Sequence, residues 1–335
     1  MGVVIKHIEY YLPEKVITNI DLAKNNPEWN IEKIEEKSGV KKRHIAEPNE
    51  TALDLAIKAV EKIFSSSVIS KDDIDAVIFC TQSHDYVMPA NSFLIHKHFN
   101  FKQSVWTFDY NLACSGYIFG LAITRGILET GLAKNVLLIN SETYSKYINL
   151  KDRSTSILFG DGAAVSVISM EDFGGIVDVI LSSSGEKFDS FYIPAGGMRT
   201  PKSDDTKKTI IDDSGNVKCL ENIHMNGFAV WQFISKNVSE QISTLLERNH
   251  LNVDDIDLYV FHQASKLTLD SLVKSLKLDR DKVFLNLENV GNTVSASVPI
   301  ALKDAELNGK LKRGDLVLLS GFGVGLSWGS IIMRY

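Results

Sequence analysis

Cysteine is scarce in this chain, which has only three among its 335 residues, namely Cys80, Cys114 and Cys219. A small, odd number of widely spaced cysteines makes a disulfide framework a poor explanation of the fold. The sequence also has no CxxC pair and no cluster of cysteine with histidine, which are the usual patterns of a zinc site. We therefore expect free thiols, no metal and no bound cofactor.

An excess of positive charge is also lacking, because 36 Lys and Arg face 42 Asp and Glu, for a net charge of −6. No basic run with interleaved aromatic residues occurs, so a nucleic-acid-binding surface is not expected. No apolar stretch approaches the length of a membrane span, and the opening residues MGVVIKHIEYYLPEK lack the apolar core of a signal peptide. These absences predict a soluble, cytoplasmic protein.

The residues that are present predict an α/β fold with a large core, since 44% of the chain is hydrophobic. The segment TALDLAIKAVEKIF has the apolar spacing of a helix, with Thr51 and Asp54 suited to its first turn. The run DAVIFCTQS that follows is typical of a buried parallel strand. The only long irregular stretch, residues 182–222, is rich in Ser, Gly, Lys and Asp, and such loops are commonly functional.

Three blocks of sequence recur in the same order along the chain. DDIDAVIFCTQS (72–83) matches DDIDLYVFHQAS (254–265) at an offset of 182 residues, and a helix ending in Gly followed by an apolar strand recurs at an offset of 178. FGDGAAVSVISM (159–170) matches FGVGLSWGSIIM (322–333) at an offset of 163. This order indicates two diverged copies of one β/α unit, which we place at residues 1–172 and 173–335.

Cys114 lies where an extended run, VWTFDYN, passes into a helical pattern that ends at Gly131. The unpaired N–H groups of a helix N-terminus would stabilise a thiolate there and lower its pKa, as in a nucleophilic cysteine. The alternative is a small, buried, inert cysteine.

The repeat relates Cys114 to Asn292 at the 178-residue offset, and relates His262 to Cys80 at the 182-residue offset. These positions are carboxyl ends of strands or helix starts, where ligands collect in α/β proteins, so we expect Cys114, His262 and Asn292 to lie near one another. His and Asn would supply donors for an oxyanion or enolate beside a cysteine thioester. Taken alone, His262 could be a structural histidine, and Asn292 an ordinary N-cap.

Together the motifs NLACSG, FHQAS, NVGNTVSASVP, LFGDGAA and GFGVGLSWGS resemble the thiolase superfamily, and within it the bacterial β-ketoacyl-ACP synthase III group. The similarity runs from SGVKKRHIAEPNET near the N-terminus to the end of the chain. The resemblance implies a thiolase-like, duplicated, five-layered α/β/α/β/α fold and a homodimer.

The resemblance implies a catalytic cycle in which Cys114 accepts an acyl group from a thioester. His262 and Asn292 would then bind the thioester carbonyl of malonyl-ACP and stabilise the enolate formed as CO₂ leaves, and attack on the acyl-cysteine would give β-ketoacyl-ACP. The acyl-enzyme oxyanion would bind the backbone N–H of Cys114 and one from the loop Gly323–Val324–Gly325. The alternative for that loop is a tight β-turn.

The donor-binding pattern departs from the resemblance. Relatives that use coenzyme A carry a tryptophan and an arginine where this sequence has Lys33 and Lys37, and Trp29 lies four residues upstream. Arg153 does match the arginine on the other side of the adenine. Acyl-CoA and acyl-ACP therefore both stay open as donors, and Lys33 and Lys37 are either phosphate contacts or a solvated helix face.

Two further roles follow from the resemblance. Met88 precedes the loop proline and would close the acyl pocket across the dimer, where a flexible side chain predicts tolerance beyond acetyl. Lys266 and Lys274 are the candidate contacts for the acyl carrier protein, and GGMRTPKS resembles a substrate-side loop.

Three functions are compatible with these residues. The first is decarboxylative condensation, which the intact His262 and Asn292 favour. The second is acyl transfer from Cys114 to an alcohol, amine or other nucleophile without decarboxylation. The third is a non-catalytic interaction protein on the same scaffold. The acyl chain and the pathway, housekeeping or dedicated, stay open.

Overall fold

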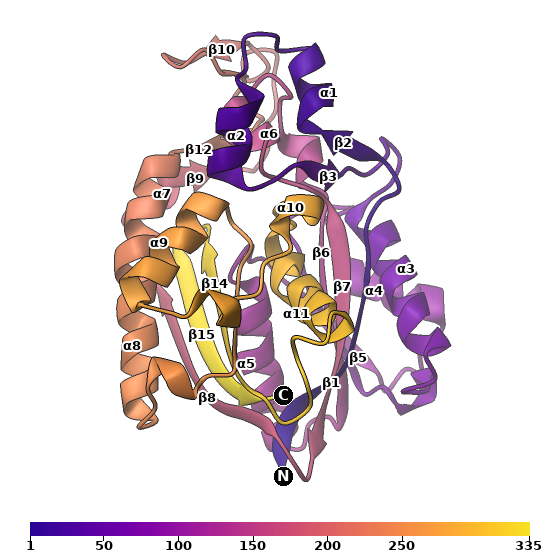
Figure 1. The fold of residues 1–335 in the computed structure, drawn as a ribbon. Coiled ribbons are helices and arrows are strands. Elements are labelled where there is room, and N and C mark those ends of the chain that lie inside the picture. Colours follow the sequence, from indigo (N-terminus) through magenta and orange to yellow (C-terminus); the bar gives the residue numbers. More distant parts are fainter.

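The computed structural model describes all 335 residues and contains two central β-sheets (Figure 1). The first sheet has five strands in the order β1-β7-β6-β4-β5, and the second has four in the order β13-β14-β15-β8. The first comprises β1 (Gly2–Tyr11), β4 (Ala76–Cys80), β5 (Trp106–Tyr110), β6 (Asn135–Glu142) and β7 (Gly162–Glu171). The second comprises β8 (Gly175–Ser183), β13 (Leu258–Phe261), β14 (Leu316–Gly323) and β15 (Ser327–Arg334).

The two sheets repeat one topology. In the first, β4 pairs parallel with β6, β6 antiparallel with β7, and β7 antiparallel with β1. In the second, β13, β14, β15 and β8 pair in the same sequence of directions. β5 pairs parallel with β4 at the edge of the first sheet. At the equivalent place beside β13, the second sheet has only one parallel bridge, between Tyr259 and Val283. The pairing agrees with the sequence repeat, and the position 172/173 lies in the turn between β7 and β8.

Helices fill three layers around the sheets. α5 (Gly116–Glu129) and α11 (Ser297–Leu307) lie between the sheets, where their apolar side chains share one core with both. α3 (Ala52–Ser65) and α4 (Asn91–Phe99) cover the outer face of the first sheet. α8 (Ser239–Arg248) and α9 (Lys266–Leu276) cover that of the second. The predicted five-layered α/β/α/β/α fold is therefore confirmed.

Local sequence explains these elements. Thr51 and Asp54 form a capping box at the start of α3, as their positions predict, and satisfy N–H groups that the first turn leaves unpaired. β4 is buried along its whole length, which accounts for its continuous apolar run. None of the helices combines the length and apolarity needed to cross a bilayer.

Smaller elements gather at the end of the molecule opposite the two termini (Figure 1). The N-terminal ones are β2 (Val16–Thr18), α1 (Asn19–Lys24), α2 (Ile31–Ser38) and β3 (Lys42–His44). The stretch predicted to be irregular forms two small sheets, from β9 (Phe191–Tyr192) with β12 (His224–Met225) and from β10 (Ile210–Ile211) with β11 (Val217–Lys218). The remaining helices are α6 (Arg153–Ser156), α7 (Gly227–Phe233), α10 (Leu287–Val290), the π-helix η4 (Ile234–Val238) and the 3₁₀ turns η1 (Lys71–Asp73), η2 (Tyr144–Tyr147), η3 (Phe188–Ser190), η5 (Val253–Asp255), η6 (Arg280–Lys282) and η7 (Val294–Ala296).

Candidate active site

Cys114 lies in the short turn between β5 and α5 and is 3% exposed. The strand β14 packs directly against it. A Cβ atom on Gly323 would lie 2.8 Å from Cys114 Cβ and 3.0 Å from its Sγ, and one on Gly321 would lie 2.7 Å from the Cys114 carbonyl oxygen. Glycine is therefore required at both positions, because any side chain would collide with the cysteine or its backbone.

His262 follows β13 and is 1% exposed. Its backbone N–H donates to the carbonyl of Ser320 at 2.8 Å, and its Nδ1 lies 2.6 Å from Ser297 Oγ. Burial lowers the pKa of His262 to about 3, so the ring is neutral at physiological pH. The Ser297 hydroxyl can donate to Nδ1 or accept from it, and in the tautomer in which it donates, the free Nε2 carries the proton and is a hydrogen-bond donor.

Asn292 is held in the loop between α10 and η7. Its N–H donates to Leu158 O at 2.9 Å, and its carbonyl accepts from Gly160 N at 3.0 Å. Its side-chain Oδ1 accepts from Val294 N at 2.9 Å, and Val294 adopts a φ of 55°, a rare conformation for a β-branched residue. Since Oδ1 is occupied, the Nδ2 group of Asn292 is the part available to a ligand.

The three residues line one cavity of about 100 Å³, together with Gly323. Its walls are mainly apolar, with Leu158, Phe159, Phe191, Met225, Val230, Trp231, Ile234 and Phe322 among the lining residues. A thiol, an imidazole and an amide thus converge on a small apolar space, which suits stabilisation of an oxyanion or enolate. The structure brings the three candidates together, while their individual catalytic roles stay predictions.

The expected low pKa of Cys114 is not found. Burial, and secondarily the nearby carboxyl group of Glu142, raise the pKa of the Cys114 thiol above its ordinary value. The reason is that no cation lies beside the thiol, and desolvation disfavours the charged form. The helix N-terminus predicted from sequence is present, since α5 begins two residues later.

The predicted oxyanion loop is tied to the nucleophile turn. Ser115 Oγ lies 2.7 Å from Ser327 Oγ, and Ser327 Oγ also donates to Val324 O at 2.8 Å. Gly323 lines the cavity of Cys114, whereas Val324 and Gly325 line a second cavity of about 360 Å³. That cavity is also lined by Tyr144, Tyr147, Phe188, Phe191, Tyr192, Ile193 and Ile223, with Gln82 and Asn111. It offers an apolar space for an acyl chain.

Met88 does not line either cavity of its own chain. It is 80% exposed, and its neighbours Tyr86 and Val87 are 60% and 88% exposed. The loop that they form between β4 and α4 presents three consecutive large apolar side chains to the outside.

The candidate donor-binding residues come together at a third site. Arg153, Lys37 and Lys33 line a hollow of about 430 Å³ together with Asn30, Ile34, Ser154, Ile157, Ser214 and Asn216. No acidic side chain is among the lining residues. This grouping favours phosphate contacts over the solvated helix face as the role of Lys33 and Lys37. Trp29 does not take part, because it is buried against Leu22 and Ile34.

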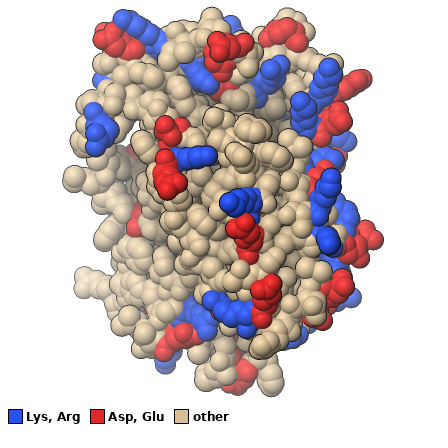
Figure 2. All heavy atoms as spheres, turned by 90° about the vertical axis from the view of Figure 1, so that its left-hand side faces the viewer, with Lys and Arg blue, Asp and Glu red and all other residues tan.

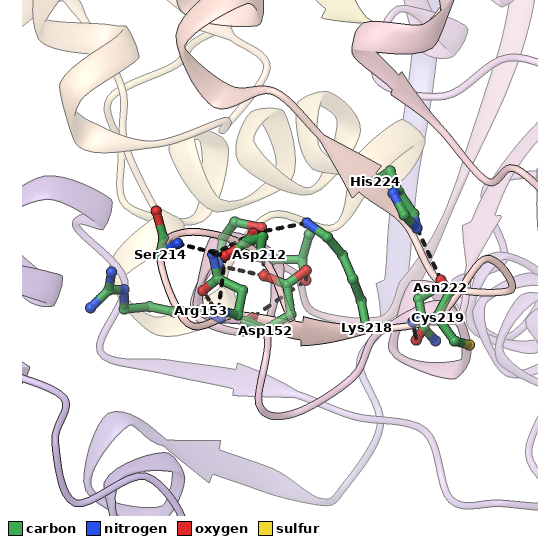
Figure 3. Close-up of polar contacts among 11 residues, drawn as sticks. Asp152, Arg153, Asp212, Ser214, Lys218, Cys219, Asn222 and His224 are labelled. Carbon is green, nitrogen blue, oxygen red and sulfur yellow. Dashed lines mark hydrogen bonds and ion pairs between the residues drawn. The ribbon is translucent and has the colours of Figure 1, made fainter. Parts of the chain in front are cut away.

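A hairpin holds Arg153 at this hollow (Figure 3). The Arg153 backbone N–H donates to Asn216 Oδ1 at 3.1 Å, and Asn216 Nδ2 donates to Asp212, which also pairs with Lys218 at 3.2 Å. The Arg153 side chain points away from these groups in Figure 3, so its guanidinium stays available. The irregular stretch predicted to be functional thus contributes Ser214 and Asn216 to the lining of this hollow.

Lys266 is less available than the sequence suggested. Its Nζ lies 2.6 Å from Asp270, and Asp270 also pairs with Arg280 at 2.9 Å. Figure 2 shows acidic and basic side chains interspersed over the face at the left of Figure 1, where α7 and α8 lie, with no single basic patch. The sequence did not single out Ser297 or Glu142; for Glu142 the available signal was a carboxyl group at the end of the buried apolar strand β6.

Comparison with known proteins agrees with this geometry. Residues 108–185 match the family described as 3-oxoacyl-[acyl-carrier-protein (ACP)] synthase III, and residues 246–335 match its C-terminal part. A β-ketoacyl-[acyl-carrier-protein] synthase III of Caldanaerobacter subterraneus is 38% identical, with 97% of this chain and 95% of the relative covered. That of Clostridioides difficile is 36% identical, over 97% and 96%. The chain belongs to the 3-oxoacyl-[acyl-carrier-protein] synthase III family.

A solved structure of a 3-oxoacyl-(acyl-carrier-protein) synthase III superposes on this chain with a TM-score of 0.97 and 38% identity, and both chains are fully covered. The predicted family, the thiolase-like fold and the assignment as an acyltransferase of the synthase III type are therefore confirmed. The predicted reaction, condensation of an acyl thioester with malonyl-ACP, is also supported by these relatives.

Proposed function

We propose that Cys114 carries the acyl group in a decarboxylative condensation with malonyl-ACP, and that His262 and Asn292 are the donor pair for the enolate. The observation that carries this proposal is the shared cavity in which these three side chains meet. In the first step Cys114 Sγ attacks the donor thioester, the tetrahedral oxyanion collapses, and the donor thiol leaves with the proton from Cys114.

In the second step malonyl-ACP enters the same cavity. As CO₂ leaves, the thioester carbonyl becomes an enolate oxygen, which accepts hydrogen bonds from His262 Nε2–H and Asn292 Nδ2–H. A neutral histidine suits this role, because it donates a hydrogen bond without giving up its proton. The carbanion attacks the acyl carbonyl, and the Cys114 thiolate leaves and regains a proton.

The second candidate is transfer of the acyl group from Cys114 to an alcohol, amine or other nucleophile. It uses the same first step but has less need of two preorganised donors. Both Nε2 of His262 and Nδ2 of Asn292 are left free by their neighbours. This observation favours condensation.

Acyl-CoA is the donor that the hollow around Arg153 fits best. Lys33, Lys37 and Arg153 supply three cations to a hollow that has no acidic residue in its lining, which suits the phosphates of a nucleotide. Without a tryptophan at this site, the adenine would rest on the Arg153 guanidinium alone. The acyl carrier protein of the second step would dock near Lys266 and Lys274 through a weak, transient contact.

We also propose that the protein is a homodimer and is located in the cytoplasm. The edge strand β5 is unpaired on one side. The loop of Tyr86, Val87 and Met88 exposes apolar side chains, and both features are typical of a surface that is buried against another chain. A second copy seated on this edge would bring Met88 to the end of the acyl cavity.

Mass spectrometry of Cys114 tests the proposal. Wild-type protein is incubated with acyl-CoA and acyl-ACP donors, and then with malonyl-ACP while CO₂ is measured. We expect Cys114 to gain the acyl group and to lose it with release of CO₂, and we expect His262→Ala and Asn292→Ala to keep acylation but lose decarboxylation. If only other nucleophiles remove the acyl group from Cys114, the result would support simple acyl transfer. If no donor acylates Cys114, the result would contradict both condensation and acyl transfer.

A further inference from the structure

The cavity of about 360 Å³ beside the oxyanion loop has a polar network on one side of its mainly apolar lining, formed by Gln82, Asn111 and Tyr144. Gln82 follows β4 and Asn111 follows β5, and these two strands pair in parallel, so their carboxyl ends bring the two amides together. Gln82 Nε2 donates to Asn111 Oδ1 at 2.7 Å, and the Tyr144 hydroxyl donates to Gln82 Oε1. Two amides and a phenol are thus linked by hydrogen bonds at the cavity wall.

This polar network leaves hydrogen-bonding groups free for a ligand. Asn111 Nδ2 and the second N–H of Gln82 Nε2 donate to no group of the protein. Asn111 is exposed and Gln82 is partly exposed, so both can be reached from the cavity that they line. An amide turned by 180° exchanges its donor and its acceptor, so the pair can offer either one. A hydroxyl group both donates and accepts, and it therefore fits each orientation.

The rest of the lining decides what else the ligand contains. No Lys, Arg, His, Asp or Glu lines this cavity, so a carboxylate or ammonium group would lie there without a counter-ion. A plain hydrocarbon chain would displace water from the two amides and offer them no hydrogen bond in return. The other walls suit methylene groups and comprise Tyr147, Phe188, Phe191, Tyr192, Ile193, Ile223 and Val324, with Gly325. A carbon chain with one neutral hydroxyl group matches the whole lining.

The cavity adjoins the space around Cys114. Phe191 lines both cavities. Cys114, Tyr144 and Phe191 also pack in one apolar cluster, against which Val324 lies. An acyl chain on Cys114 Sγ therefore has this cavity as its neighbouring space, with the polar network in its wall.

We propose that the acyl group carried by Cys114 bears a hydroxyl group, which Gln82 and Asn111 bind while Tyr144 holds Gln82 in place. The proposal rests on the function proposed for Cys114 and names its substrate class as a hydroxyacyl thioester. Cys114 Sγ replaces the donor sulfur on the acyl carbonyl carbon, and the donor thiol leaves with the proton from Cys114. The hydroxyl group takes no part in the bonds that form and break, so its hydrogen bonds act on substrate choice.

Binding to Cys114→Ala tests the proposal without acyl transfer, because the donor thioester stays intact. Calorimetric titration compares butyryl-CoA with 3-hydroxybutyryl-CoA and 4-hydroxybutyryl-CoA, which have the same chain length and differ in the hydroxyl group. We expect one hydroxybutyryl donor to bind about tenfold more tightly than butyryl-CoA, as one net hydrogen bond predicts. Equal affinity for all three donors would overturn the proposal.

Asn111→Leu, made in the Cys114→Ala protein, separates ligand binding from a structural role of the polar network. Leucine is close to asparagine in size and forms no hydrogen bond, so the preference for the hydroxyl group should fall to about onefold while the affinity for butyryl-CoA is kept. Gln103→Leu is the matched control, since Gln103 is exposed in the turn before β5 and lines neither cavity, and it should keep the preference. An equal loss of affinity for all donors in Asn111→Leu would show a structural role alone and overturn the proposal.

Acylation of wild-type Cys114 by the same donors is followed in parallel by mass spectrometry. A failure of the proposed function is then seen separately, as binding with a hydroxyl preference but no acyl group on Cys114.

Discussion

Ser297 Oγ lies 2.6 Å from Nδ1 of His262, so this ring nitrogen is engaged and Nε2 is the one left free for a ligand. Both residues are buried, and Ser297 begins the helix α11, whose position between the sheets is fixed by core packing. A rigid helix start therefore fixes the orientation of a histidine that follows a strand of the neighbouring sheet.

Replacing Ser297 with Ala should slow decarboxylation and leave acylation of Cys114 nearly unchanged. Loss of one buried hydrogen bond of about 1 kcal/mol predicts a fall of about fivefold to tenfold. CO₂ release from malonyl-ACP and the rate of acyl-enzyme formation measure the two steps. Ser297→Thr keeps a hydroxyl and should restore part of the activity. An equal fall in both steps would speak against a role through His262.

Gly323→Ala should impair the first step, because its Cβ would lie 2.8 Å and 3.0 Å from the Cβ and Sγ of Cys114. We expect destabilisation of about 1–3 kcal/mol from overpacking and at least a tenfold loss of acylation. Gly126→Ala in α5 is the control, since a Cβ there meets nothing within 4 Å and alanine favours a helix. Urea unfolding and acyl transfer to Cys114 are measured for both. Normal acylation of Gly323→Ala would contradict the close packing.

Removing a cation from the hollow lined by Lys33, Lys37 and Arg153 should raise KM for an acyl donor that contains a nucleotide. It should leave KM unchanged for a donor that contains none. Arg153→Ala should raise KM for acyl-CoA roughly threefold to tenfold, since a hydrogen bond from an exposed cation to phosphate contributes about 1 kcal/mol. KM for the same acyl group on pantetheine should not change. The exposed Lys310→Ala serves as the control. A parallel rise for both donors would place the effect elsewhere.

Folding stability should fall with rising pH because of Glu142. The pKa of this group is raised from 4.5 to about 8 on folding, so the folded state holds the proton more tightly than the unfolded state. Its contribution is fully present below about 4.5 and is lost as the pH rises toward 8, with a slope of up to about 1.4 kcal/mol per pH unit. Urea unfolding at pH 5.5, 6.5 and 7.5 should show Glu142→Gln losing less stability than the wild type. Parallel slopes would mean that Glu142 is ionised throughout.

If Met88 closes the acyl pocket across the proposed homodimer, Met88→Phe should narrow the range of acyl chains that are accepted. Phenylalanine is bulkier and stiffer than methionine, so we expect acetyl to be retained and longer or branched chains to be lost. Competition among acyl-CoA donors, read as the mass on Cys114, gives the preference, and sedimentation velocity checks the dimer. An unchanged preference in a stable dimer would exclude Met88 from the acyl pocket.

The sequence alone indicated the duplication, which relates Cys114 to Asn292 and His262 to Cys80, and the two sheets of the structure repeat one topology. The duplication is visible in the sequence because apolar periodicity and glycine-rich turns are local properties, and two copies of one such pattern can be aligned with each other. The same local signals predicted α3 and its cap and the buried strand β4.

Only the tertiary structure decided the electrostatics and the grouping of distant polar residues. Cys114 has a raised pKa although it precedes a helix, because desolvation depends on everything packed around a group and not on its neighbours in sequence. Lys33, Lys37 and Arg153 share one hollow, and Glu142 reaches Ser295 across the two halves. Such contacts join residues more than a hundred positions apart, and no local pattern of the chain encodes them.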